Sequence, residues 1–149
     1  MLKILLAIDD SKFSEAATQA VLRQFRSQDT EVRVLHVVEP VHVVVTDVIH
    51  GYIPDMEAVR QAQLKEAGEL VERVARVLQD AGMRVSTAVS DGDPKLKIID
   101  YAAEWEADLI VVGSHGRKGL ERLLLGSVSA AVANHARCSA LIVRIAPNR

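Results

Sequence analysis

The chain has 149 residues, of which 49% are hydrophobic and 26% are charged. This length and composition are typical of one soluble globular domain spanning residues 1–149, and they exclude a disordered or fibrous chain. The formal net charge of −2 gives no electrostatic footprint for binding nucleic acid through its backbone phosphates. Because Cys138 is the only cysteine, an intrachain disulfide and a cysteine-rich metal site are also excluded, and we expect a reducing, cytoplasmic setting.

The N-terminal part of the chain predicts a strand, a helix and a second strand. Residues Leu2–Ile8 form an apolar run typical of a strand covered on both faces, and Asp9 and Asp10 end it. The run is too short to span a membrane, and no signal-peptide cleavage site follows it. Either Asp10 or Ser11 can cap the next helix, and Asp10 is the favoured cap. The segment "EVRVLHVVE" then predicts a second strand that ends near Val38.

The middle of the chain contains a segment with no clear pattern, followed by a long helix. Residues Val41–Pro54 are rich in β-branched residues and could pair as a strand. Prolines and a glycine bracket them, however, so we favour a long loop that could close over a site as a lid. From about Asp55 to Gly82 the apolar residues have the spacing of an amphipathic helix, which Gly82 ends.

The C-terminal part continues the alternation of strands and helices. The segment "MRVSTAVS" predicts a third strand, and Asp93 followed by Pro94 marks the start of a helix. The segment "DLIVVG" predicts a fourth strand, a helix runs through Val128 to His135, and "SALIVRI" predicts a fifth strand. This alternation predicts an α/β fold with helices on both faces of a doubly wound parallel sheet. In such sheets ligands bind outside the carboxyl ends of the strands, where the strand order reverses.

A stretch rich in glycine follows the fourth predicted strand. It carries Gly113 and Gly116 and then, after nine residues, Gly126 and Ser127 at the start of a helix. The first N–H groups of a helix have no partners within the helix and lie at the positive end of its dipole, so they favour an anion. Gly126 would let a ligand approach the backbone closely, and Ser127 and Ser129 would add hydroxyl donors. The spacing matches neither a Walker loop nor a dinucleotide fingerprint.

A simpler interpretation of the same stretch stays open on spacing alone. Gly113 and Gly116 could make turns, and Ser127 could be an ordinary N-cap. Under this interpretation the stretch connects a strand to a helix and binds nothing.

The pattern G-x2-G-x9-G-[ST] resembles the ATP-binding motif of the universal stress protein family. Other segments resemble the family in the same order and cover essentially the whole chain: "LLAIDDS", "LHVVE", "GDP", "ADLIVVGSHGR" and "LLLGSVS". The resemblance implies a Rossmann-like fold with a five-stranded parallel sheet of order 3-2-1-4-5. Because the motif is intact, it also implies ATP bound between the ends of the first and fourth strands. Ser139 departs from the family, which commonly has proline before the last strand.

The resemblance assigns roles to residues outside the glycine stretch. Asp9 matches the aspartate that contacts the ribose of the nucleotide or the metal ion on its phosphates, and an Asx-turn or a helix cap is the alternative. Four residues match the positions that frame the adenine ring, with core packing as the alternative: Ala7, Ile8, Val37 and Val38.

The complete set of predicted nucleotide-binding residues joins these positions to the glycine stretch. It consists of Ala7, Ile8, Asp9, Val37, Val38, Gly113, Gly116, Arg117, Gly126, Ser127, Val128 and Ser129, and Asp9 is also the predicted ligand of Mg²⁺.

Arg117 and Lys118 could neutralise phosphate charge or be solvated loop residues. His115 has no nucleophile or second acid evident beside it, so we predict no catalytic residue. His42 and His50 lack a matching set of metal ligands.

Three functions are compatible with these features. The leading one is a stress-response protein that binds ATP with Mg²⁺ and changes its shape or partner with nucleotide state, a regulatory role that the family implies. The second is an enzyme that slowly hydrolyses ATP or transfers its nucleotidyl group, for which no general base or acceptor site is evident. The third is an interaction protein that holds a structural nucleotide.

We also expect a homodimer through the last strand, Ser139 to Ala146, because edge strands need cover and family dimers commonly pair there.

Overall fold

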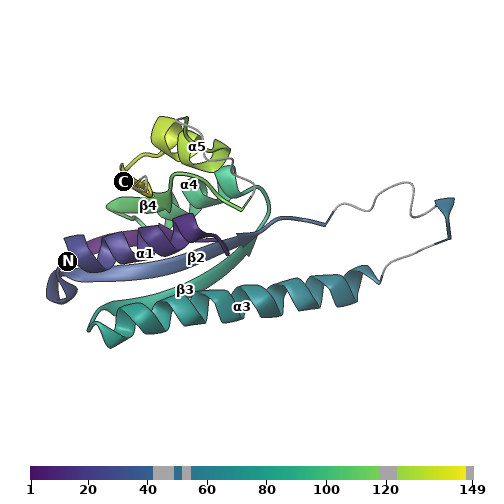
Figure 1. Cartoon of the computed structure of the whole chain (residues 1–149), viewed down its shortest axis with the longest axis horizontal. Helices are drawn as coiled ribbons and strands as arrows, with labels where there is room; N and C mark the ends of the chain where they lie inside the picture. The colour runs from purple at the N-terminus through teal and green to yellow at the C-terminus, as the bar shows by residue number, and fades with distance from the viewer. Residues whose placement is uncertain (42–48, 52–54, 118–123, 147–149) are drawn as a thin grey trace.

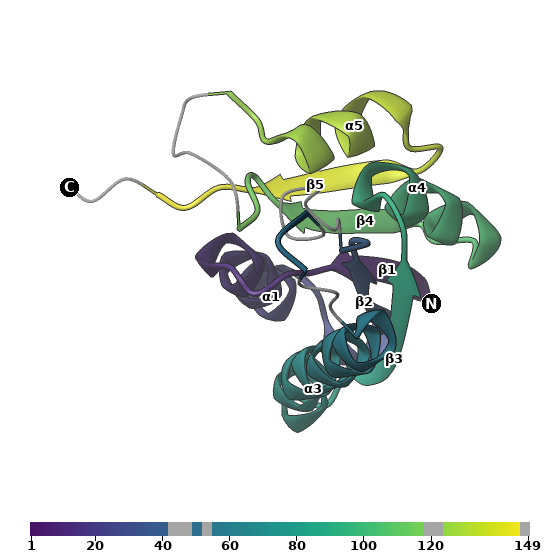
Figure 2. The same cartoon turned by 90° about the vertical axis from the view of Figure 1, so that its right-hand side faces the viewer.

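The computed structural model describes residues 1–41, 49–51, 55–117 and 124–146. In the described part of the chain, five strands pair in parallel in one sheet, in the order β3-β2-β1-β4-β5 (Figure 1 and Figure 2). This confirms the predicted sheet and its order. The strands are β1 (Leu2–Ala7), β2 (Thr30–Val38), β3 (Arg84–Asp91), β4 (Leu109–Gly113) and β5 (Ser139–Val143).

Helices cover both faces of the sheet, as the alternating pattern predicts. They are α1 (Lys12–Gln24), α3 (Met56–Asp80), α4 (Pro94–Glu104) and α5 (Ser127–His135), with a short 3-10 helix η1 (Ser27–Asp29) that the sequence did not indicate. α1 and α3 pack on one face, and α4 and α5 pack on the other (Figure 2). None of the helices among the described residues is long and apolar enough to span a membrane.

The continuous apolar run of β1 follows from this layering, because alternate side chains enter different cores. Ile4 and Leu6 belong to the core beneath α1 and α3, whereas Leu5 belongs to the core beneath α4 and α5. All three side chains are fully buried. A central strand of a doubly covered sheet therefore has no face that needs polar residues.

Polar side chains cap the helices and fix where they begin. The hydroxyl of Ser11 accepts a hydrogen bond from the N–H of Ser14, so Ser11 caps α1 and the prediction of Asp10 as the cap is wrong. Asp93 caps α4 by accepting from the N–H of Lys95, with Pro94 in the first helical position as predicted. Because Ser11 caps α1 and β1 ends at Ala7, the residues just before α1 lie at the carboxyl end of β1.

The end of α3 also follows the prediction from its glycine. Gly82 has a φ of +87°, which suits glycine, and its N–H donates to the carbonyl of Gln79 at 2.8 Å. Most of the predicted lid, Val41–Pro54, lies outside the described residues. His42 also lies outside them.

Candidate functional site

The candidate site lies where the strand order reverses. β1 pairs with β2 on one side and with β4 on the other, and the chain passes through β2 and β3 before it returns to β4. Asp9 follows β1, and the residues from Ser114 to Arg117 follow β4. The structure therefore brings the predicted aspartate and the start of the glycine stretch to the same edge of the sheet, at the position where doubly wound sheets bind ligands.

Asp9 links the end of β1 to the loop after β4. One carboxylate oxygen, Oδ1, accepts a hydrogen bond from the hydroxyl of Ser14 at 2.8 Å, and the other, Oδ2, accepts from the backbone N–H of Arg117 at 3.0 Å. The Ser14 hydroxyl oxygen also accepts from the N–H of Asp9 at 2.8 Å. Ser14 is buried, and its two hydrogen bonds with Asp9 hold the carboxylate in one orientation. The sequence interpretation missed Ser14, although its place in the first turn of the helix after Asp9 was visible.

The three glycines of the motif are needed for space. A Cβ on Gly113 would lie 2.7–2.8 Å from atoms of Phe13, and a Cβ on Gly116 would lie 2.7 Å from Oδ2 of Asp9. A Cβ on Gly126 would lie 3.2 Å from both the Cα of His115 and the carbonyl oxygen of Ser114.

Backbone conformation does not explain the same glycines. Among the glycines that the structure describes, positive φ values occur at Gly51, Gly82 and Gly92. The motif glycines therefore do not need the left-handed region that glycine turns commonly use. Within the chain, Gly113 leaves space for Phe13 of α1, Gly116 leaves space for Asp9, and Gly126 lets the start of α5 lie close to the loop after β4.

Ser114 is the centre of this packing. Its N–H donates to the carbonyl of Val143 in β5, and its carbonyl accepts from the N–H of Gly126 at 2.8 Å and from the hydroxyl of Ser129 at 2.7 Å. Ser114 is 3% exposed and Ser129 is 2% exposed. One buried residue thus joins β4, β5 and α5. The sequence indicated Ser129 but not Ser114, because the contact depends on the return of the chain at Gly126.

The N-terminus of α5 is formed by Gly126, Ser127 and Val128. Gly126 is the N-cap residue and Ser127 is the first helical residue, so the alternative in which Ser127 is the N-cap is wrong. The Ser127 side chain is exposed, and Val128 is half-buried against the core beneath α4 and α5. The hydroxyl of Ser129 donates inward to Ser114, so here it braces the loop. The first backbone N–H groups of α5 remain the donors that a helix offers to an anion.

The four residues predicted to frame adenine lie at the ends of β1 and β2. Ala7, Ile8 and Val37 are buried, and Val38 is half-buried. Nδ1 of His36 lies 2.7 Å from the carbonyl oxygen of Ile8. Because a carbonyl can only accept, His36 donates, and this bond holds the ends of β1 and β2 together beside the site.

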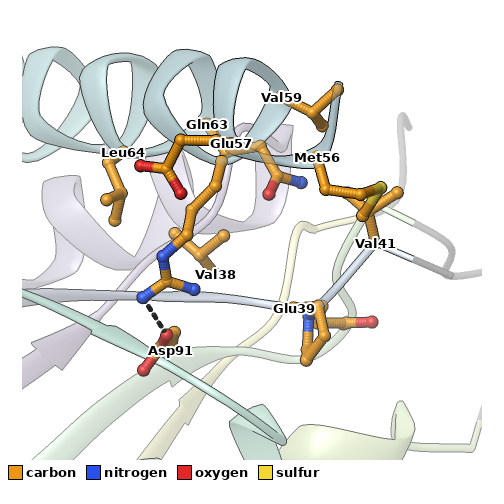
Figure 3. Close-up of a pocket in the computed structure, with 11 residues that line it drawn as sticks. Val38, Glu39, Val41, Met56, Glu57, Val59, Gln63, Leu64 and Asp91 are labelled. Atoms are coloured by element: carbon orange, nitrogen blue, oxygen red, sulfur yellow. Dashed lines mark hydrogen bonds and ion pairs between the residues drawn. The ribbon is translucent and has the colours of Figure 1, made fainter. Parts of the chain in front are cut away.

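Two pockets open beside these strand ends. One, of about 240 Å³, lies between the first turns of α3 and the ends of β2 and β3, and Val38 and Leu64 line it (Figure 3). The other, of about 290 Å³, lies between α1 and α3 and includes Asp9 and Ser14. No sequence pattern indicated either pocket, because each is lined by residues from segments that are far apart in the chain.

An ion pair joins α3 to the end of β3 in the first pocket. Nη2 of Arg60 lies 2.7 Å from Oδ2 of Asp91. The hydrogen bond from Arg60 and its positive charge lower the pKa of the Asp91 carboxyl below its ordinary value. Both side chains are more than half exposed, so the pair adds little to stability.

Only one of the basic side chains considered for balancing the charge of the phosphates, that of Arg117, lies among the described residues. The side chain of Arg117 is exposed, and Lys118 and Arg122 lie outside the described residues. In the described part of the chain, no three His, Cys, Asp or Glu side chains gather into a metal site. Asp9 alone fits Mg²⁺ only together with a nucleotide, because Mg²⁺ commonly takes one or two protein carboxylates and completes its shell with phosphates and water.

The fold and the site define a doubly wound α/β protein with a helix N-terminus and an aspartate at its strand-order reversal. The sequence model of the universal stress protein family matches residues 1–144. The universal stress protein YxiE of Bacillus subtilis is 35% identical over 146 residues, which cover 95% of this chain and 98% of YxiE. The chain belongs to the universal stress protein family.

Solved structures of related proteins have the same fold. The structure of MJ0577 of Methanocaldococcus jannaschii matches with a TM-score of 0.79 and 26% identity, covering 99% of this chain and 98% of that chain. A universal stress protein family protein of Arabidopsis thaliana, solved with AMP bound, matches with a TM-score of 0.70 and 19% identity, covering 98% of this chain and 93% of that chain. Because the Arabidopsis thaliana protein is only 19% identical to this chain, this similarity shows the fold alone.

Proposed function

We propose that this protein binds an adenine nucleotide, ATP with Mg²⁺, between the carboxyl ends of β1 and β4, and that the bound nucleotide regulates its interactions in a cytoplasmic stress response. The observation that carries the proposal is the meeting of Asp9, the loop after β4 and the N-terminus of α5 at the point where the strand order reverses. Each of these elements offers a group that a nucleotide needs.

The phosphates would bind at the N-terminus of α5. The backbone N–H groups of Ser127 and Val128 lie in its first turn, where the helix supplies no carbonyl acceptor. The exposed hydroxyl of Ser127 adds a donor, and the side chain of Arg117 supplies a positive charge on the neighbouring loop. Ser129 would act through the position of the loop, because its hydroxyl donates to the carbonyl of Ser114.

Asp9 would bind the ribose or the Mg²⁺ on the phosphates. Among the described residues, Oδ1 accepts from Ser14 and Oδ2 accepts from Arg117, and a carboxylate has further lone pairs for a ligand. The adenine ring would lie against Ala7, Ile8, Val37 and Val38 at the ends of β1 and β2. Mg²⁺ bound at Asp9 would neutralise part of the charge of the phosphates.

The relative with AMP bound supports the class of ligand, because it has the same fold and its ligand is an adenine nucleotide. The choice of ATP rests on the intact motif Gly113, Gly116, Gly126 and Ser127, which resembles that of the ATP-binding members of the family. Binding is favoured over hydrolysis because both ring nitrogens of His115 are engaged in internal hydrogen bonds. His115 is therefore not poised as a general base.

We also propose that the protein forms a homodimer through β5. This strand lies at one edge of the sheet, with β4 as its only neighbour in the order β3-β2-β1-β4-β5 of the described strands. Ser139 and Ala140 are exposed, and Ile145 beyond the strand is 41% exposed. Pairing of two such edges from Ser139 to Ala146 would cover these groups.

The first test is to denature freshly purified protein, remove the polypeptide, and identify and quantify the released nucleotide by chromatography. ATP close to one molecule per chain is the expected result. Release of mostly ADP or AMP would instead favour a slow hydrolase. A protein that carries no nucleotide and binds no added Mg-ATP would refute the proposed function.

A pair of glycine variants locates the site. In Gly126→Val the new side chain meets the backbone of Ser114 and His115, so α5 must move and ATP binding is expected to be lost while the fold survives. Gly68→Val is the matched control, because a Cβ at Gly68 of α3 has nothing within 4 Å. Unchanged ATP affinity in Gly126→Val would show that the nucleotide binds elsewhere.

A further inference from the structure

His115 connects the two ends of the glycine stretch. Its Nε2 lies 2.7 Å from the carbonyl oxygen of Leu124, and its Nδ1 lies 3.1 Å from the hydroxyl oxygen of Ser114. A carbonyl oxygen only accepts hydrogen bonds, so Nε2 carries the proton and donates to Leu124. In the neutral imidazole, Nδ1 then accepts from the hydroxyl of Ser114. Ser114 near one end of the glycine stretch and Leu124 near the other thus hold the ring in one tautomer.

The ring also lies close to neighbouring elements of the fold. The ring centroids of His115 and Phe13 are 5.1 Å apart, which ties the imidazole to α1. A Cβ added to Gly126 would lie 3.6 Å from Cδ2 of His115, which is ordinary van der Waals contact. The imidazole therefore lies close to both α1 and the residue that caps α5. A side chain that lacked its ring nitrogens would leave this position without its bond to Leu124.

We propose that His115 is a positioning residue for the phosphates: by joining Leu124 to Ser114, it fixes the N-terminus of α5 against the loop after β4. Nine residues separate Gly116 from Gly126, the residue that caps α5. The N–H of Gly126 donates to the carbonyl of Ser114, and His115 fastens the chain two residues before it. The inference rests on the proposed function, because it concerns the same anion site.

Two amide side chains of different length test the hydrogen bond to Leu124. In His115→Gln the amide nitrogen reaches about as far as Nε2, whereas in His115→Asn it reaches only about as far as Nδ1. Titration calorimetry with Mg-ATP and with adenosine, which lacks phosphates, separates an effect on the phosphate site from general damage. His115→Ala serves as the full deletion.

We expect His115→Ala and His115→Asn to weaken Mg-ATP binding about tenfold, the effect of losing one hydrogen bond that orders the site, and to leave adenosine binding unchanged. His115→Gln should restore Mg-ATP affinity to within about threefold of the wild type. Amide hydrogen exchange gives a readout without nucleotide: the Gly126 N–H should exchange faster in the alanine and asparagine variants than in the glutamine variant.

Other outcomes separate the inference from the proposed function. Equal Mg-ATP affinity in all variants would overturn the positioning role of His115 and leave the proposed nucleotide site intact. Equal losses for Mg-ATP and adenosine would also overturn it, because the damage would then not be specific to the phosphates. If the wild-type protein binds no adenine nucleotide, the proposed function fails and the inference fails with it.

Discussion

The carboxylate of Asp9 accepts a hydrogen bond from the backbone N–H of Arg117 at 3.0 Å, which joins two residues 108 positions apart in the chain. Asp9 follows β1 and Arg117 lies on the loop after β4, so this bond closes the sheet edge at which the strand order reverses. Gly116 lies directly beside it, and a Cβ there would come within 2.7 Å of Oδ2 of Asp9. The absence of a side chain at Gly116 is therefore a condition for this orientation of Asp9.

Gly116→Ala is expected to weaken nucleotide binding without unfolding the protein. The atom that must move is the end of the Asp9 side chain, so the fold can absorb the change, but the bond to Arg117 is lost and Asp9 is misplaced for a ribose or Mg²⁺. We expect the Kd for Mg-ATP to rise about tenfold or more, measured by titration calorimetry. Gly68→Ala on α3 provides the control, because the added methyl meets no atom within 4 Å. Wild-type affinity in Gly116→Ala would argue against a direct role of Asp9.

Gly113→Ala is expected to destabilise the fold itself. Here the added Cβ would lie 2.8 Å from the backbone carbon and oxygen of Phe13, so all of α1 must shift away from β4. Overpacking of this kind lowers the free energy of unfolding by about 1–3 kcal/mol. Urea unfolding followed by circular dichroism measures the loss. Gly68→Ala should instead raise the free energy of unfolding, by up to about 1 kcal/mol, because alanine favours a helix interior more than glycine does. Equal stability of the two variants would contradict the packing assigned to Gly113.

Ser14→Ala is expected to affect both stability and binding. Removal of the hydroxyl deletes a donor to Oδ1 of Asp9 and the acceptor of the Asp9 N–H, which lowers the free energy of unfolding by about 1–2 kcal/mol. Ser11→Ala is the matched control on the same helix, because loss of that cap costs about 1 kcal/mol but removes no contact with Asp9. Only Ser14→Ala should weaken Mg-ATP binding. If both variants bind alike, Ser14 does not position Asp9.

The sequence predicted the sheet, its order and the helices well because their signals are local or belong to the whole family pattern. Apolar runs mark strands that are covered on both faces, and Asp93 with Pro94 marks a helix start wherever it occurs. The choice between Asp10 and Ser11 as a cap was wrong because both residue types cap well. Which of them caps depends on where the chain turns after β1.

The internal contacts of the site could not be predicted in the same way. The sequence attributed the motif glycines to turns or to the approach of a ligand, and nothing in it indicated that Phe13, Asp9 and His115 are their neighbours within the fold. Contacts such as that between Asp9 and Arg117 join segments that only the complete fold brings together. The same holds for Ser114, whose carbonyl partners lie on the far side of a nine-residue separation in the motif.

Arg60→Gln is expected to raise the pKa of Asp91. The hydrogen bond and the charge of Arg60 lower this pKa below the ordinary value of an aspartate, and Lys97 contributes less, so the variant should return the pKa toward that ordinary range. Because the folded-state pKa is depressed, the ion pair contributes stability above the pKa of the unfolded chain and loses it as the pH falls through the folded-state pKa. Wild type and variant should therefore differ slightly in stability at neutral pH and converge as the pH falls below the folded-state pKa of Asp91.

An NMR titration of the Asp91 carboxyl carbon measures this shift directly, and Arg76→Gln on the same helix is the control. Since both members of the pair are exposed, added salt should weaken the shift, and the difference in unfolding free energy at neutral pH should be small. An unchanged Asp91 pKa in Arg60→Gln would mean that the ion pair does not persist in solution. The first turns of α3 would then not be held to the end of β3 by this contact, and the pocket that Val38 lines would lose the ion pair that links its two sides.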